Sequence, residues 1–313
     1  MAATSTLRTR PPGKPPKTRD TLLSQDRRLG YGLITPAIVL LLAVTAFPLV
    51  YNIWNSFHYA TPTIPVVNGK PAGLANYRRM FASGSAFGPA FIHTVLFTVV
   101  SVAIEMVIGL VLALALNKPF RGRGLVRAAV FIPWAVPTVV SAEIWKGMFD
   151  PQQGFVDYAL KILHLPGSTT TWLANADTSW VAIFVADAWK NTPFVAIILI
   201  GGLQVIPLEL YEAAKLDGAS AWRQFRRLTL PLLKPALMVA LIFRTLSAFL
   251  LFDVVYIMTG GGPGTSTETL AYLNYDAFLN AQDYGYGGAI SISLIILALL
   301  IAGAYTRIFR EKA

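Results

Sequence analysis

The sequence predicts an all-α membrane protein with six transmembrane helices. Apolar residues make up 55% of the 313 residues and charged residues 13%, whereas a soluble domain carries about 25% charge. The mean hydropathy is +0.55. Apolar runs of about twenty residues, long enough to cross a bilayer as a helix, recur along the chain. This composition excludes a disordered chain, a collagen and a protein devoted to nucleic-acid binding.

The first 28 residues are expected to form a disordered basic tail. They are rich in Pro, Thr and basic residues and too polar to bury a core. The apolar run at 31–57 that follows is far longer than the roughly 7 to 15 residues of a signal-peptide core, and it lacks a clear cleavage site. We interpret it as a retained first span, which places the membrane domain at residues 29–313.

Five further apolar runs give the remaining predicted spans, at 90–116, 128–149, 180–203, 235–258 and 288–308. If the six spans cross the membrane one after another, nineteen of the 26 Lys and Arg residues lie on one side of it and five on the other. By the positive-inside rule the basic side is cytoplasmic, so both termini are expected in the cytoplasm. The same distribution explains the net charge of +10 without an anionic partner.

Motifs of common enzyme classes are absent from the sequence. It contains no GxxxxGK[ST] phosphate loop, no HExxH and no GxSxG. The lack of cysteine excludes disulfides and thiolate sites, and the three histidines are far apart in sequence, which disfavours a metal cluster. We therefore expect no catalytic residue, no metal and no cofactor on this chain.

A polar segment at 206–231, between the fourth and fifth spans, is predicted to form a helix, a turn and a second helix at the cytoplasmic face. Pro207 and Glu209 are typical of a helix start, Gly218 permits a turn, and Ser220 suits the N-cap of the next helix. Physical reasoning alone leaves two interpretations, a structured loop or a docking element.

The same segment resembles the EAA motif of ABC importer permeases. Glu212-Ala213-Ala214 is followed by Asp217-Gly218-Ala219 and by Leu230-Pro231, after Ile206-Pro207. In that family the motif forms a coupling helix that docks in a groove of a separate ATPase subunit. The resemblance implies a MetI-like type I importer permease, with ATP and Mg on the partner ATPase. The implied ATPase-coupling residues are Glu212, Ala213, Ala214, Asp217, Gly218 and Ala219.

Two other stretches, at 187–194 and 252–263, resemble the carbohydrate-uptake branch of this family. Together with the span plan, the resemblance covers about residues 30–310. It implies maltose- or trehalose-type sugar import by alternating access in a bacterial plasma membrane. The implied partners are a second six-span permease subunit in a heterodimer, two ATPase subunits and an external solute-binding protein or lipoprotein.

Polar residues inside the spans are candidate sugar ligands. Asp187, Lys190, Asn191 and Phe194 are spaced i, i+3, i+4 and i+7, so they share one helical face. Ionisable groups are costly in lipid, so this face is expected to line a protein interior or a wet cavity. With the resemblance, the predicted substrate-binding set is Asp187, Lys190, Asn191, Phe194, Arg244, Asp253 and Tyr256.

Alternative interpretations of these residues stay open. Asp187 and Lys190 can satisfy each other as an ion pair, while Arg244 and Asp253 pack against neighbouring helices. In that case the charged residues of spans four and five are structural. The run at 260–264 is expected to form a tight external loop.

Two further intramembrane acids, Glu105 and Glu143, are interpreted as interhelical hydrogen-bonding groups. Two other functions compete with sugar import. In a polyol-phosphate importer, Lys190 and Arg244 would neutralise the phosphate. In a membrane-embedded enzyme, an acid such as Asp187 would serve as acid or base.

Overall fold

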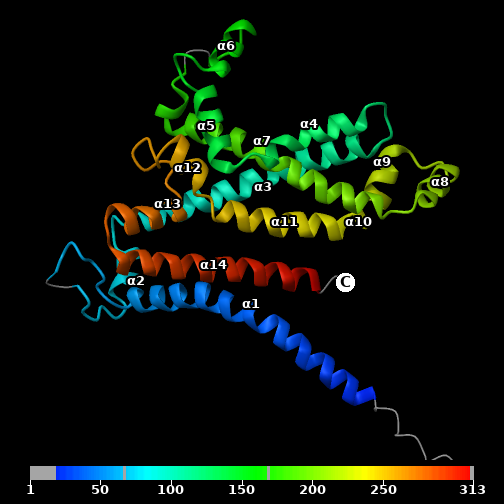
Figure 1. The fold of residues 1–313 in the computed structure, drawn as a ribbon. Coiled ribbons are helices and arrows are strands. Elements are labelled where there is room, and N and C mark those ends of the chain that lie inside the picture. The colour runs from blue at the N-terminus through cyan, green and yellow to red at the C-terminus, as the bar shows by residue number, and fades with distance from the viewer. Residues whose placement is uncertain (1–18, 66–67, 168–169, 311–313) are drawn as a thin grey trace, which may run out of the picture. The chain divides into compact units, whose positions relative to one another are not determined.

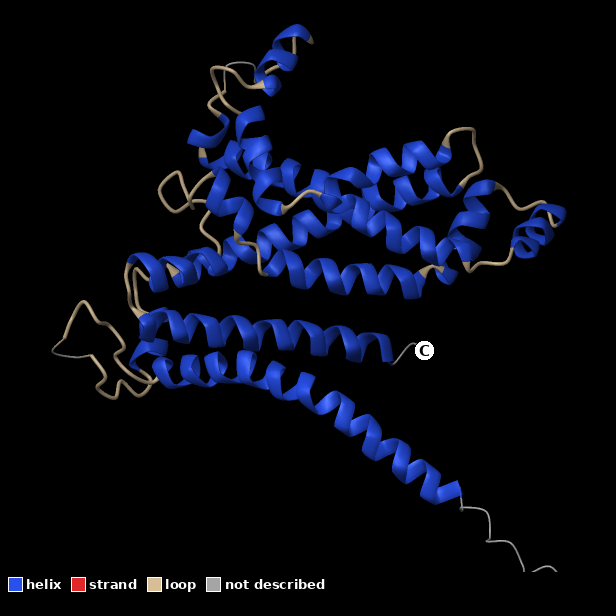
Figure 2. Ribbon diagram, viewed as in Figure 1, coloured by secondary structure: helices blue, strands red, loops and turns tan. Residues whose placement is uncertain are grey.

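The computed structural model describes residues 19–65, 68–167 and 170–310. Within these ranges the regular structure is helical (Figure 2), and the single β-bridge among them pairs His58 with Pro71. The predicted all-α fold is confirmed. The chain divides into two units, residues 1–51 and residues 52–313.

The first unit consists, in its described part, of helix α1, which runs over Arg19–Ser56 and enters the second unit after Tyr51. Its segment Leu29–Ser56 is 28 residues long and apolar enough to span a membrane. The Thr45 hydroxyl donates a hydrogen bond to the backbone oxygen of Leu41, so this polar group is satisfied within the helix and not left unpaired in lipid. The helix begins inside the predicted tail, and residues 1–18 of that tail lie outside the described residues.

The second unit contains the remaining helices. Two of its segments have π-helical hydrogen bonding, at Phe225–Thr229 and Asp276–Asn280. A 3₁₀ turn at Trp172–Ala174 precedes α7. The α-helices are α2 (Ala75–Met80), α3 (Phe87–Asn117), α4 (Arg123–Ala135), α5 (Thr138–Met148), α6 (Phe155–Ile162), α7 (Ala176–Gln204), α8 (Leu208–Leu216), α9 (Ala221–Gln224), α10 (Leu230–Leu232), α11 (Lys234–Phe249), α12 (Asp253–Met258), α13 (Leu270–Tyr275) and α14 (Tyr284–Arg310).

Among the described residues, five segments can each span a membrane: Leu29–Ser56, Phe87–Asn117, Ala176–Gln204, Ala221–Phe249 and Tyr284–Ile308. The pair α4 and α5 passes the same test together, but it is bent by 96°. Pro133 lies inside α4 and Pro137 directly precedes α5, and proline interrupts the helical hydrogen bonds there. Each of the six predicted spans thus corresponds to one of these five segments or to the broken pair, although the segment that corresponds to the fifth span does not have the predicted bounds.

The fifth span also differs from its predicted form. It was expected to run over 235–258, but α11 ends at Phe249 and α12 begins only at Asp253. In the break, Thr269 donates its hydroxyl to the backbone oxygen of Leu251 at 2.8 Å. That bond satisfies a carbonyl that the interrupted helix leaves free. The break lies in an apolar run, so composition gave no sign of it.

Helices α3, α7 and α11 pack together at the centre of the second unit (Figure 1). Glycines permit the close approach. A methyl group on Gly109 of α3 would lie 2.6 Å from Val195 Cγ1 of α7, and one on Gly202 of α7 would lie 2.4 Å from Ala236 Cβ of α11. Small residues at such contacts let the backbones of membrane helices come close to one another.

Replacing Gly109 by alanine is expected to lower the free energy of unfolding by about 1–3 kcal/mol, the usual cost of overpacking a core. Thermal unfolding of the purified protein measures the loss. The double variant Gly109→Ala/Val195→Ala removes Val195 Cγ1 but keeps Val195 Cβ, 2.8 Å from the added methyl group, so it should recover only part of the loss. Gly303→Ala is the control, because a methyl group there meets no atom within 4 Å. Equal losses in Gly109→Ala and Gly303→Ala would contradict the packing argument.

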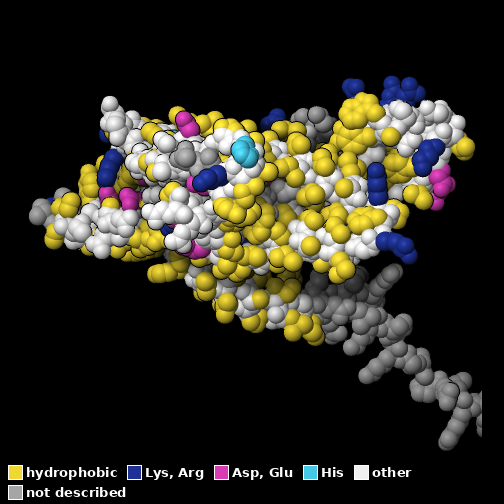
Figure 3. All heavy atoms as spheres, turned by 90° about the horizontal axis from the view of Figure 1, so that it is seen from above, with side chains coloured by type: hydrophobic (Ala, Val, Ile, Leu, Met, Phe, Trp, Pro, Cys, Tyr) yellow, Lys and Arg dark blue, Asp and Glu magenta, His cyan; other side chains and the backbone are white. Residues whose placement is uncertain are grey.

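The surface of the spans is apolar. Figure 3 shows hydrophobic side chains over much of the face seen from above, and a group of Lys and Arg side chains over the end that carries α8 and α9. Val107 of α3 and Leu299 of α14 are among the exposed large apolar residues. Lipid is the natural solvent for such side chains, as the hydropathy of the sequence predicted.

Candidate functional site

A group of charged side chains lies buried between α3, α7 and α11. Arg244 of α11 donates from Nε to Glu105 Oε2 and from Nη2 to Glu105 Oε1, the second bond measuring 2.6 Å. Arg244 Nη2 also lies 3.1 Å from Asp187 Oδ2 of α7. Glu105, Asp187 and Arg244 are exposed by only 0%, 3% and 4%. One guanidinium therefore joins two carboxylates from two other helices.

Two neutral side chains complete this buried network. Ser101 Oγ lies 2.5 Å from Asp187 Oδ2 and 3.3 Å from Glu105 Oε1. Asn191 Nδ2 donates to Asp187 Oδ1 at 2.7 Å. Both oxygens of Asp187 are thus hydrogen-bonded, as a carboxylate removed from water requires. We use the term buried network for Ser101, Glu105, Asp187, Asn191 and Arg244.

Lys190 is turned toward the broken span rather than toward Asp187. Its Nζ donates to the backbone oxygen of Val136 at 2.6 Å, and its side chain is largely buried. Val136 is the C-cap of α4, where carbonyl groups lack helical donors and the helix dipole is negative. Lys190 therefore stabilises the break between α4 and α5, and the alternative ion pair between Asp187 and Lys190 does not form.

The other predicted ligands lie apart from the buried network. The ring of Phe194 contacts Trp134 of α4 and Phe243 of α11, with centroids 5.9 Å and 6.2 Å away. Asp253 is exposed in the first turn of α12, and Tyr256 is 45% exposed among other aromatic rings. Within the described residues, no hydrogen bond or ion pair joins Asp253 or Tyr256 to the buried network.

The structure thus brings together Asp187, Asn191 and Arg244 but not the whole predicted set. Arg244 contacts neighbouring helices, as the structural alternative describes, but its partners include Asp187, which that alternative paired with Lys190. Substrate contact by these residues stays a prediction. The interhelical role is confirmed for Glu105 but not for Glu143, whose exposed side chain makes no hydrogen bond within the described residues.

Ser101 was missed by the sequence reasoning, although a signal was present. Polar residues recur on α3 at Thr94, Thr98, Ser101 and Glu105, a spacing that places them on one helical face. All four are buried. Thr94 also accepts a hydrogen bond from the backbone nitrogen of Leu270 at 2.9 Å. A polar stripe on an otherwise apolar span indicates a face turned toward protein.

The EAA-like segment folds as α8, a glycine turn and α9. Ala219 N donates to Ala214 O at 2.9 Å, and Gly218 N donates to Lys215 O at 3.0 Å. Gly218 has a φ of +71°, a conformation that favours glycine. These features form a Schellman motif, in which Ala214 and Ala219 hold the two positions that commonly make a hydrophobic contact. Ser220 caps α9 by accepting from Arg223 N. The predicted helix, turn and helix are confirmed.

Most residues of the EAA-like motif are exposed at the surface of the α8–α9 segment. Glu212, Ala213, Asp217 and Gly218 are exposed. Leu216, at the end of α8, is 90% exposed. Leu208 and Trp222 of the same segment are also largely exposed, and several large apolar side chains at the surface of a polar segment are typical of an interaction site. The geometry therefore favours a docking element over a mere connecting loop.

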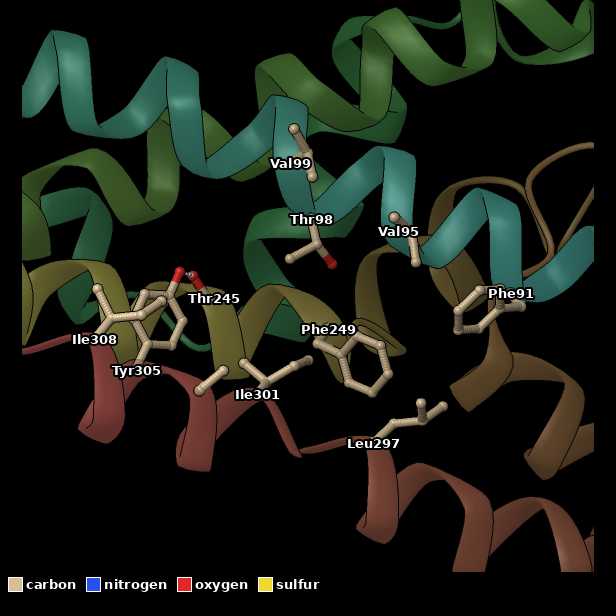
Figure 4. Close-up of a pocket in the computed structure, with 11 residues that line it drawn as sticks. Phe91, Val95, Thr98, Val99, Thr245, Phe249, Leu297, Ile301, Tyr305 and Ile308 are labelled. Atoms are coloured by element: carbon tan, nitrogen blue, oxygen red, sulfur yellow. Dashed lines mark hydrogen bonds between the residues drawn. The ribbon is translucent and has the colours of Figure 1, made fainter. Parts of the chain in front are cut away.

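An apolar groove of about 380 Å³ lies between α3, α11 and α14. In Figure 4, Val95, Phe249 and Ile301 line it. Its polar side chains include Thr98 and the pair Thr245 and Tyr305, whose hydroxyls are hydrogen-bonded. Such a lining suits hydrocarbon and offers few partners to a polyhydroxylated ligand. We therefore do not assign the groove to substrate.

Comparison with known proteins agrees with this geometry. Residues 105–312 match the family described as binding-protein-dependent transport system inner membrane component. The chain is 42% identical over 289 residues to a trehalose/maltose transport system permease protein, MalF, of Thermococcus litoralis, with 92% of this chain and 96% of the relative covered. It is 37% identical over 291 residues to a trehalose transport system permease protein, SugA, of Mycobacterium tuberculosis, covering 92% and 91%.

The fold is similar to that of a chain in the crystal structure of a bacterial alginate ABC transporter in complex with a pentasaccharide-bound periplasmic protein. The TM-score is 0.80 at 21% identity, with 94% of this chain and 98% of that chain covered. This likeness shows the importer-permease fold. The matched family and the relatives establish that this chain is a membrane-spanning transport subunit and not an enzyme, and that it belongs to the family of inner membrane components of binding-protein-dependent ABC transport systems.

Proposed function

We propose that this chain is one permease subunit of an ATP-driven sugar importer and forms half of its translocation pathway. The observation that carries the proposal is the 42% identity, over 92% of the chain, to a permease named for trehalose and maltose. A second relative is named for trehalose. The substrate class is accordingly a disaccharide such as trehalose or maltose, in preference to a polyol phosphate.

In this proposal both termini and the α8–α9 segment lie in the cytoplasm, and α12 and α13 lie toward the outside. The distribution of Lys and Arg along the sequence supports this orientation. The exposed Arg223 of α9, and Arg226 and Arg227 of the π-helical segment after it, belong to the basic side.

The partners are a second six-span permease subunit, two ATPase subunits that hold ATP and Mg, and an external solute-binding protein. The α8–α9 segment docks on one ATPase, with Glu212 to Ala219 at the contact. ATP drives transport because the ATPases bind it with different affinities in the two states of the pathway. The segment joins α7 to α11, so a displacement of α8 acts directly on two helices of the buried network.

The assembly is tested by purifying the chain, tagged at its C-terminus, from its native membrane in mild detergent and identifying the co-purified proteins by mass spectrometry. We expect a phosphate-loop ATPase and a second EAA-bearing permease. Recovery of the chain alone, while the ATPase is present in the membrane, would contradict the docking role of α8.

The substrate is tested in proteoliposomes that contain the whole complex, with its binding protein outside and ATP inside. We expect saturable, ATP-dependent uptake of labelled trehalose or maltose. Excess unlabelled disaccharide should compete, and glycerol phosphate should not. Uptake of glycerol phosphate but of neither disaccharide would overturn the substrate assignment and leave the importer assignment in place.

A further inference from the structure

Four aromatic rings gather on α12 and α13, and we call them the aromatic platform: Phe252, Tyr256, Tyr272 and Tyr275. Phe252 stacks on Tyr256 with centroids 5.3 Å apart and lies 5.0 Å from Tyr275. Tyr256 and Tyr275 meet edge to face at 5.0 Å, and their hydroxyls lie 3.3 Å apart. Tyr256 is 45% exposed. The platform therefore presents part of its ring surface and hydroxyl groups outward.

The loop at 260–264 holds this platform rigidly. Gly261 has a φ of +80°, and a methyl group there would lie 2.8 Å from the Tyr272 ring. Only glycine lets the backbone lie this close to the ring in that conformation. Thr267 fixes the loop, since its hydroxyl donates to Gly262 O at 2.8 Å and its backbone nitrogen donates to Gly261 O at 3.1 Å. A fixed ring loses little entropy when it binds a ligand.

Two carboxyl groups lie beside the platform. Glu268 is 7% exposed, yet its carboxyl makes no hydrogen bond or ion pair within the described residues. Burial, and then the charge of Asp276, raise the pKa of Glu268 to about 7. At neutral pH Glu268 can therefore either donate or accept a hydrogen bond. Glu268, Tyr272 and Asp276 are spaced i, i+4 and i+8 along the chain, which brings the two carboxyl groups to the same side as the Tyr272 ring. Asp276 Oδ1 accepts a hydrogen bond from Asn280 Nδ2 at 2.7 Å, and its other oxygen makes no hydrogen bond within the described residues.

The platform lies at the end of α11 opposite to α8 and α10 (Figure 1). If α8 docks on an ATPase in the cytoplasm, the platform is at the outer mouth of the pathway. Arg244 lies on α11 between these two ends, and through it the buried network contacts this helix. A ligand that enters from outside therefore meets the rings before it reaches the face of Asp187 and Asn191.

We propose that the aromatic platform is an outer sugar subsite, on which a pyranose ring stacks against Tyr256 and Tyr275 while Glu268 and Asp276 bind its hydroxyl groups. The inference rests on the proposed sugar-import function. A sugar ring has apolar C–H faces and polar edges, so it needs an aromatic surface with hydrogen-bonding groups at its side. The Glu268 carboxyl makes no hydrogen bond within the described residues, so it is available to a sugar hydroxyl.

The test compares Tyr256→Leu, Tyr256→Phe and Tyr275→Leu in the reconstituted complex, with trehalose and maltose as probes. Each Leu variant keeps an apolar side chain but loses the ring face. At saturating liganded binding protein, we expect uptake by each Leu variant to fall about tenfold, the ratio that follows from losing about 1.4 kcal/mol. Tyr256→Phe keeps the ring and should retain most of the uptake. Tyr158→Leu, which alters an exposed tyrosine of α6, should behave as the unchanged protein.

A second measurement separates a sugar subsite from a protein-docking surface. The concentration of liganded binding protein that half-maximally stimulates ATP hydrolysis should be the same in the Leu variants and in the unchanged complex. A rise in that concentration, with uptake at saturation unchanged, would overturn the proposal in favour of protein docking. Unchanged uptake in both Leu variants would overturn it outright. If the unchanged complex imports neither sugar, the proposed function itself fails.

Discussion

Replacing Arg244 by alanine is expected to lower the free energy of unfolding by about 3–5 kcal/mol, the usual result of leaving a buried charge unpaired. Two carboxylates, Glu105 and Asp187, would then lie in a site that water does not reach. They come from different helices, so their repulsion would separate α3 from α7. Thermal unfolding of the purified complex, together with the yield of folded protein from the membrane, measures the effect.

A matched variant distinguishes loss of charge balance from loss of the arginine itself. Arg244→Met combined with Glu105→Gln and Asp187→Asn removes all three charges and should recover most of the stability, because uncharged residues of similar volume often replace buried ion pairs at little cost. If the triple variant is as unstable as Arg244→Ala, the charges are not what holds the three helices together.

Replacing Gly218 by alanine is expected to lower sugar uptake about 5- to 30-fold without unfolding the spans. The left-handed conformation raises the free energy of a residue with a Cβ by about 1–2 kcal/mol. This corresponds to a factor of about 5–30 in the population of the native turn. No neighbouring atom lies within 4 Å of the added methyl group, so the effect comes from the backbone alone. Uptake and ATP hydrolysis by the reconstituted complex measure it, and thermal unfolding checks the fold.

Two control variants accompany this prediction. Gly218→Asn should keep much of the uptake, because asparagine tolerates the left-handed region better than alanine does. Gly124→Ala alters a glycine near the start of α4 whose φ is not positive and whose added methyl group meets no atom within 4 Å, and it should leave uptake unchanged. Full uptake by Gly218→Ala would mean that the Schellman turn is not needed for coupling.

The sequence predicted the fold and the α8–α9 segment well, because their signals are local. Apolar length identifies a span wherever it lies, and Pro207, Gly218 and Ser220 mark helix ends by their own backbone chemistry. The family resemblance then gave the segment a role. These inferences needed no knowledge of which helices pack together.

The parts that the sequence did not reveal depend on tertiary contacts. Asp187 and Lys190 share a helical face, yet Arg244 from another helix pairs with Asp187, and Lys190 bonds to a carbonyl in the broken span. Periodicity along one helix cannot choose between such partners. The break after Phe249 was missed for the same reason, since its freed carbonyl is satisfied by Thr269, far along the chain.

The bond between Lys190 and Val136 also bears on how the pathway can move. Backbone oxygens in the interior of a continuous helix are already paired, so a side chain from another helix finds a free one at a helix end or at a break within a span. Through this bond, one flexible side chain of α7 contacts the corner between α4 and α5. A corner held in this way can pivot while the lysine follows it, and the third span then changes its angle by sliding at the contact between Trp134 of α4 and Phe194 of α7.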